Sequence, residues 1–99
     1  MKIKQPEAKY VDEDQWEWSV ELDGAPEELE QVDAVVYTLH HTFPKPVRRV
    51  NTRENNFRLQ AAGWGEFMVY ATVEFNNGSE EQLEHWLELH YPDGTRTTN

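Results

Sequence analysis

The 99-residue sequence contains no cysteine, little positive charge and no long apolar run. Without cysteine, the chain can form neither a disulfide framework nor a thiolate metal site. No apolar stretch approaches the roughly 18 residues that a membrane-spanning helix needs. The first residues also lack the apolar segment of a signal peptide. We therefore expect a protein of the cytoplasm that has no membrane partner.

Basic residues are outnumbered, with nine Lys and Arg against 19 Asp and Glu, and the net charge is −10. A strongly acidic chain lacks the basic footprint of nucleic-acid binding, so we expect no nucleic-acid partner. The charge favours a basic protein tail as partner, although an acidic surface also serves solubility alone. The basic residues are unevenly placed, because five of the nine lie between Lys45 and Arg58.

Residue patterns that carry catalysis or metal binding are missing as well. Serine occurs only at Ser19 and Ser79, so no nucleophile elbow is present. His85 and His90 are five residues apart on one expected strand, and they point to opposite faces. Gly63-Trp64-Gly65 lacks the third glycine and the long helix of a dinucleotide fingerprint. We expect no enzyme, no cofactor and no metal site.

Alternating apolar and polar residues predict a chain built from short strands with almost no helix. The turn signals include Asn77-Gly78, and a single helical turn is expected over residues 25–33. Residues 95–99 read as a frayed end. The expected strands cover residues 3–11 (an edge strand), 16–22 (half-buried), 33–41, 47–50, 57–61, 67–75 and 83–91.

This pattern predicts an all-β fold, an immunoglobulin-like antiparallel β-sandwich of about seven to eight strands. A small closed barrel is the alternative architecture. Residues 1–99 are expected to form a single domain, because the sequence shows no repeats and no low-complexity linker.

Two short irregular pieces interrupt the strands, at His40–Pro44 and Gly63–Phe67. Each places a large aromatic residue, Phe43 or Trp64, in an expected turn. An aromatic residue in a loop is typical of a binding surface, but it also serves as a plug at the end of a core. The glycines beside Trp64 predict a tight loop, through positive φ or close backbone approach.

The segments L-H-H-T-F-P (residues 39–44) and G-W-G-E-F (residues 63–67) resemble the YEATS domain family in order and spacing. The similarity is strongest over residues 16–91, and the L-E-L-H-Y-P-D-G segment near the end is closer to the prokaryotic YEATS-like branch. The resemblance implies an immunoglobulin-like sandwich. It also implies a reader of acylated lysine, including acetyllysine and crotonyllysine, which are best known on histone tails.

The resemblance also implies roles for individual residues. Phe43 and Trp64 would form the two walls of an acyl-lysine slot. Thr42 would offer its hydroxyl to the acyl amide, and the backbone N–H of Trp64 would bind the acyl carbonyl. His40 would brace the first loop, and Gly63 would allow close approach. The acyl-lysine-binding residues carried over by position are His40, Thr42, Phe43, Gly63, Trp64 and Gly65.

Two tryptophans are candidates for peripheral contacts to the ligand. Eukaryotic members carry a further pocket aromatic before the early strand, where this chain has Trp16 as the nearest aromatic. Trp86 lies near the position of a peptide-contacting acid in eukaryotic members. The alternative function is a protein–protein interaction adaptor of a prokaryotic signalling or defence system, with the same scaffold but without acyl-lysine recognition.

Overall fold

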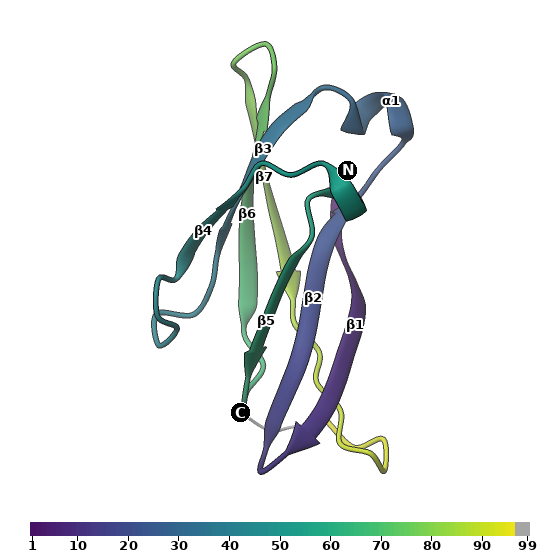
Figure 1. Ribbon diagram of the computed structural model, residues 1–99, viewed down its shortest axis with the longest axis vertical. Helices are drawn as coiled ribbons and strands as arrows, with labels where there is room; N and C mark the ends of the chain where they lie inside the picture. The colour runs from purple at the N-terminus through teal and green to yellow at the C-terminus, as the bar shows by residue number, and fades with distance from the viewer. Residues whose placement is uncertain (97–99) are drawn as a thin grey trace.

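Two antiparallel β-sheets face each other across a hydrophobic core in the computed structural model, which describes residues 1–96 (Figure 1). The predicted immunoglobulin-like β-sandwich is confirmed, and the described residues form seven strands in two sheets rather than a closed barrel. The first sheet contains, in spatial order, β1 (Lys2–Asp12), β2 (Gln15–Asp23) and β5 (Leu59–Gly63). The second contains, in spatial order, β4 (Val47–Val50), β3 (Val32–Thr38), β6 (Met68–Phe75) and β7 (Glu80–Trp86).

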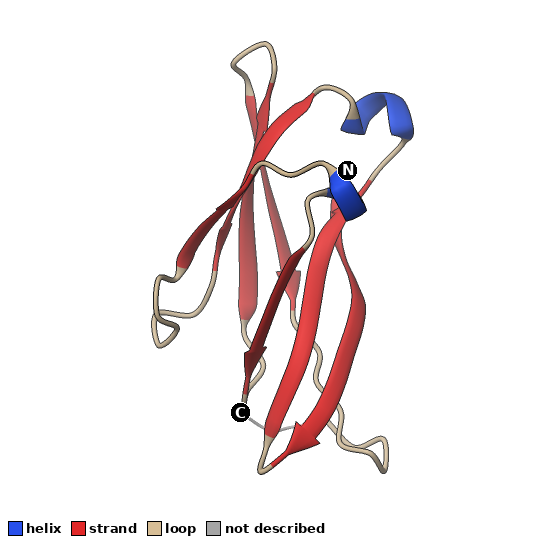
Figure 2. Cartoon of the chain, viewed as in Figure 1, coloured by secondary structure: helices blue, strands red, loops and turns tan. Residues whose placement is uncertain are grey.

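Helix is confined to two short turns in the described residues (Figure 2). The α-helical turn α1 (Pro26–Leu29) has Pro26 in its first turn, and the Glu28 carboxylate accepts a 3.1 Å hydrogen bond from the Ala25 N–H. The predicted helical turn therefore forms, but it is shorter than residues 25–33, because β3 already begins at Val32. The 3₁₀ turn η1 (Glu54–Asn56) lies in the segment expected to be a loop.

The core is formed by the inward-facing residues of the central strands, which are β2, β3 and β6. Tyr37 is fully buried, and its hydroxyl donates a 2.8 Å hydrogen bond to the backbone carbonyl of Phe57. Burial raises the pKa of the Tyr37 phenol, and the negative charge of Glu21 raises it further. The buried side chains of these three strands include Trp16, Trp18, Val20, Leu22, Val35, Tyr37, Val69, Ala71 and Val73.

Strand β2 is more deeply buried than the alternation predicts. Glu21, expected on the solvent face, has a carboxylate that is only 6% exposed. Arg58 from the segment before β5 and Lys4 from β1 approach that carboxylate at 2.8 Å and 3.4 Å. The prediction of a half-buried strand is therefore wrong at this position, because the long side chains of Lys4 and Arg58 cover the Glu21 carboxylate.

Several strand boundaries differ from the expected ones. Phe57 has a left-handed backbone, with φ of 61°, so β5 begins only at Leu59. The hairpin turn is confirmed, with Gly78 at φ of 88° between β6 and β7. Strand β7 ends at Trp86, earlier than predicted, although Leu87 and Leu89 remain fully buried beyond it.

Residues 95 and 96, the described part of the expected frayed end, make backbone contacts with the preceding segment. Arg96 pairs with His90 in an isolated β-bridge, whereas the rest of the expected frayed end, residues 97–99, lies outside the described residues. Among residues 1–96, no helix is long and apolar enough to cross a membrane.

Candidate functional site

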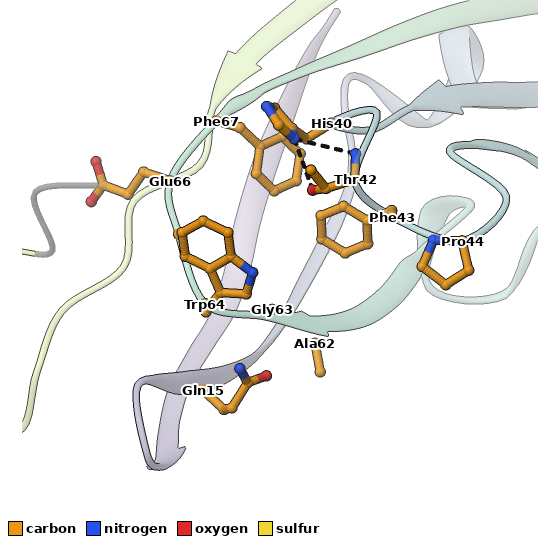
Figure 3. Close-up of a pocket in the computed structure, with 11 residues that line it drawn as sticks. Gln15, His40, Thr42, Phe43, Pro44, Ala62, Gly63, Trp64, Glu66 and Phe67 are labelled. Atoms are coloured by element: carbon orange, nitrogen blue, oxygen red, sulfur yellow. Dashed lines mark hydrogen bonds between the residues drawn. The ribbon is translucent and has the colours of Figure 1, made fainter.

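Two loops at one end of the sandwich border a cavity of about 470 Å³ (Figure 3). One loop covers residues 39–46, between β3 and β4, and the other covers residues 64–67, between β5 and β6. The volume lies within the usual range of small-ligand pockets. All six residues expected to bind the acyl-lysine line this cavity. The complete lining comprises Gln15, His40, Thr42, Phe43, Pro44, Ala62, Gly63, Trp64, Gly65, Glu66 and Phe67.

The first loop is held in a tight turn by bonds within itself. The Phe43 N–H donates a 3.0 Å hydrogen bond to the His40 carbonyl. The His40 Nδ1 lies 2.8 Å from the Thr42 hydroxyl oxygen and accepts a 3.4 Å bond from the Thr42 N–H. In the tautomer in which Nδ1 carries no hydrogen, the hydroxyl donates to it, and the oxygen lone pairs of Thr42 stay available for another donor.

Phe43 forms a half-buried wall between the cavity and the core. Its ring centroid lies 6.1 Å from that of Trp18 in an edge-to-face arrangement, and 5.2 Å from that of Phe67. The Arg48 guanidinium carbon lies 5.9 Å from the Phe43 centroid. The loop aromatic therefore both plugs the end of the core and lines the cavity, so the two interpretations of its position do not exclude each other.

Gly63 is favoured by close packing rather than by backbone conformation. A Cβ at this position would lie 3.0 Å from Cζ of Phe43, which is too close for an ordinary van der Waals contact. The positive-φ glycines among the described residues are Gly78 and Gly94. Of the two expected reasons for a glycine here, close approach is therefore the one that the structure supports.

Trp64 forms the other wall of the cavity. Its side chain is 53% exposed, and Figure 3 shows its ring on the side of the cavity opposite Phe43. A large apolar residue left half in solvent contributes little to a core. Trp64 therefore fits a binding surface better than a core plug.

The cavity contains an aromatic side chain that the sequence interpretation missed as a lining residue. The sequence places Phe67 both at the end of the irregular piece Gly63–Phe67 and at the start of an expected strand, and β6 begins one residue later, at Met68. The Phe67 ring is 7% exposed and lies 6.1 Å from the His40 ring, centroid to centroid. Its place directly after the G-W-G-E segment was the available signal. The other lining residues that the sequence did not single out for the site are Gln15, Pro44, Ala62 and Glu66.

Glu66 is the one acidic side chain in the lining, and its carboxylate points away from the cavity (Figure 3). It accepts hydrogen bonds from the Trp86 indole at 2.8 Å, from the Leu89 N–H at 2.9 Å and from Arg96 at 2.8 Å and 3.1 Å. Burial alone would raise the pKa of Glu66, but these donors outweigh it and hold the pKa below its ordinary value.

The structure does not bring the two candidate peripheral tryptophans into the lining. Trp16 is fully buried, and its indole donates a 2.7 Å hydrogen bond to the His90 carbonyl. Its burial leaves no surface for a ligand. Trp86 is 46% exposed, but it contacts Glu66 outside the cavity. Within residues 1–96, no group of three or more histidine or acidic side chains is placed to hold a metal ion.

Comparison with known proteins identifies relatives across most of the chain. The family model described as the prokaryotic YEATS domain matches residues 16–88. The transcription initiation factor TFIID subunit 14 of Schizosaccharomyces pombe is 33% identical over 79 residues, which are 74% of this chain and 32% of that protein. The chain thus spans about a third of the length of this curated relative.

Solved structures agree with the fold. The Yaf9 YEATS domain bound to H3K27ac superposes with a TM-score of 0.62 and 26% identity, over 96% of this chain and 72% of that chain. The Yaf9 YEATS domain recognising an H3K122suc peptide matches with the same TM-score and identity, over 97% and 72%. Taken with the two loops that border the cavity, these matches show that the chain belongs to the prokaryotic YEATS domain family.

Proposed function

We propose that this domain is a non-enzymatic reader module, whose cavity holds the side chain of an acylated lysine on a protein tail. The observation that carries the proposal is the position of Phe43 and Trp64 on opposite sides of a 470 Å³ cavity, with Thr42 at its border. The solved Yaf9 YEATS domains bind H3K27ac and recognise an H3K122suc peptide, and this chain has the same fold.

The aromatic lining suits an acylated lysine better than a free one. Acylation removes the lysine charge and leaves a flat amide with a short apolar tail. A flat group between Phe43 and Trp64 gains contact area, and a stack as favourable as an aromatic pair would add about 0.5–1.5 kcal/mol beyond burial. An unmodified ammonium group would lose its hydration on entering the same space.

The amide of the ligand needs hydrogen-bond partners once it leaves water. The lone pairs of the Thr42 hydroxyl accept its N–H, because His40 Nδ1 takes the hydroxyl hydrogen. The backbone N–H of Trp64 donates to its carbonyl oxygen. An unpaired amide would cost about 1–3 kcal/mol, so these two partners make the site selective for an amide and not merely for an apolar chain.

The acidic surface of the chain favours a basic tail around the acylated lysine. The net charge of −10 draws a Lys- and Arg-rich segment toward the domain at low ionic strength. This attraction does not depend on acylation. Salt should therefore reduce the overall affinity while leaving the preference for the acylated form intact.

The proposal is tested by calorimetry with one lysine peptide in acetylated and unmodified forms. Phe43→Ala and Trp64→Ala should each weaken binding of the acetylated peptide at least about tenfold, which corresponds to 1.4 kcal/mol. Tyr70→Ala is the matched control, because Tyr70 is an aromatic residue of β6 that is 50% exposed and lies outside the lining. Wild-type affinity in Trp64→Ala would contradict the proposal.

The alternative function, a protein-interaction adaptor without acyl-lysine recognition, draws support from a second aromatic surface. Tyr70 and Trp86 are half exposed on neighbouring strands β6 and β7, and the exposed Glu84 of β7 pairs with Tyr70. Such a surface suits a protein partner. Binding that is equal for acylated and unmodified peptides, and lost in Tyr70→Ala, would favour this function over the reader.

A further inference from the structure

We propose that Glu66 is a positioning residue, which holds the Trp64 wall in place by binding the segment of residues 86–96, which begins at the last residue of β7. In this proposal the segment lines no part of the cavity, but it supports from outside the loop that carries Trp64. The consequence for ligand affinity rests on the proposed reader function. The structural part of the proposal, that Glu66 fixes the loop, does not depend on any ligand.

The Glu66 carboxylate accepts four hydrogen bonds from that segment. Its Oε1 accepts from the Trp86 indole and from Nη2 of Arg96, both at 2.8 Å. Its Oε2 accepts from the Leu89 N–H at 2.9 Å and from Nε of Arg96 at 3.1 Å. Arg96 therefore binds the carboxylate with two parallel bonds, the geometry that fixes both position and orientation. The Glu66 side chain is only 5% exposed, whereas the Arg96 side chain is 45% exposed.

A second bond ties the same loop to the same segment. The Leu87 N–H donates a 3.0 Å hydrogen bond to the carbonyl of Phe67. Two consecutive loop residues are therefore attached to the chain after β7. Trp64 lies only two residues before Glu66, and its side chain is 53% exposed. With half of its side chain in solvent, its position depends strongly on how its own backbone is held.

The described end of the chain is folded back so that Arg96 reaches Glu66. The Gly94 N–H donates to the Tyr91 carbonyl, and the Tyr91 N–H donates to the Thr95 carbonyl, each at 2.8 Å. Gly94 has a φ of 91°, which a residue with a side chain adopts at a cost. This turn and the His90–Arg96 bridge place the guanidinium group beside the loop.

This arrangement extends beyond the part of the chain that matches the family model. The match covers residues 16–88, whereas Leu89 and Arg96 lie after it. Two of the three residues that donate to Glu66 are therefore outside the stretch that defines the family. A fragment that ends at residue 88 would contain every lining residue of the cavity but would lack the Leu89 N–H and the Arg96 guanidinium group.

The first test compares Glu66→Gln and Arg96→Ala with wild type, using the acetylated peptide. Each variant should weaken binding at least about fivefold, the lower end of typical coupling between separate sites. Arg96→Lys should restore only part of the affinity lost in Arg96→Ala, because lysine cannot form the two parallel bonds. Glu74→Gln is the matched control, because it removes a carboxylate paired with Arg49 on the four-stranded sheet.

The second test needs no ligand. We would measure backbone ¹⁵N relaxation and amide hydrogen exchange of residues 64–67, together with the indole N–H signal of Trp64, in all four variants. Glu66→Gln and Arg96→Ala should show faster exchange and more motion in this loop than wild type, with the sheets unchanged, and Glu74→Gln should not. Arg96 is 45% exposed, so its truncation leaves the core intact.

The two tests separate the two proposals. If wild type binds no acylated peptide, the reader function fails, and the ligand-free measurement still decides the role of Glu66. If the loop of Glu66→Gln and Arg96→Ala exchanges as slowly as in wild type, Glu66 does not position Trp64 and the inference is wrong. An equal loss of affinity in Glu74→Gln would likewise contradict it, because the effect would then not be specific to the loop.

Discussion

Replacing Gly63 by alanine should close the cavity while leaving most of the fold intact. The added Cβ would lie 3.0 Å from Cζ of Phe43 and 3.8 Å from the Trp18 indole nitrogen. The backbone at Gly63 does not require positive φ, so an alanine meets no conformational penalty there. The whole effect must therefore come from contact with the neighbouring rings, of which Phe43 is the closer and the less buried.

The expected cost in stability is small. Overpacking of this kind costs about 1–3 kcal/mol, and the reduced freedom of the unfolded chain returns about 0.4–1 kcal/mol. The net loss is then at most about 2.6 kcal/mol from those two ranges. Because Phe43 is half-buried and has the cavity beside it, the ring can turn, and we expect a loss of about 1 kcal/mol. That corresponds to roughly 4–8 °C in Tm.

The expected cost in binding is larger, because the displaced ring occupies the space of the acyl chain. Calorimetry should show at least about a tenfold loss of affinity for the acetylated peptide, while thermal unfolding shows the small shift. The matched control is Gly24→Ala, whose Cβ would lie 3.3 Å from the flexible Met1 side chain and far in sequence from both loops. Wild-type affinity in Gly63→Ala would contradict this prediction, because the Phe43 ring would then not form a wall of the ligand site.

Two further predictions concern stability. Glu21→Gln should lower the free energy of unfolding by about 1.5–3 kcal/mol, because it removes the charged acceptor of the 2.8 Å bond from Arg58. Urea unfolding measures this loss. A loss under about 0.5 kcal/mol, which is typical of a surface substitution, would contradict the prediction. Burial lowers the pKa of His85, whose Nε2 lies 2.9 Å from the Gln5 amide oxygen, although Glu88 opposes the shift. The unfolded state therefore binds a proton more readily, so stability should fall as the pH drops below about 6.5 and through the lower native pKa. His85→Gln should flatten the decrease of unfolding free energy with falling pH. If this free energy falls equally in wild type and in His85→Gln, the prediction is wrong.

The strand predictions succeeded where burial follows a period of two. Burial alternates clearly along β6, and β2, β3 and β6 all lie where the sequence pattern placed them, within a few residues. The left-handed backbone at Phe57 was not predictable, because nothing in its residue type favours positive φ. The burial of Glu21 was missed for another reason, since it depends on Lys4 and Arg58 reaching across from neighbouring strands.

Prediction of the site is limited in the same way, because contacts between residues far apart in the sequence leave no local pattern. The six residues suggested by the family resemblance all line the cavity, because the two motifs fix the two loops that border it. Phe67 lines it too, but as the last residue of the second motif and the first of an expected strand it was given no binding role. The role of Glu66 was invisible in the sequence, because its partner Arg96 is 30 residues away and no periodic pattern connects them. Contacts between loops depend on tertiary structure, and short sequence motifs do not encode them.

An NMR amide-shift titration tests the central claim most directly. One lysine peptide would be added in acetylated, crotonylated and unmodified forms, each at two salt concentrations. We expect shifts centred on Thr42, Phe43 and residues 63–65, seen with the acylated peptides only and retained at high salt. Shifts that ignore acylation, or that spread along the acidic segments and vanish with salt, would contradict a reader whose site is this cavity.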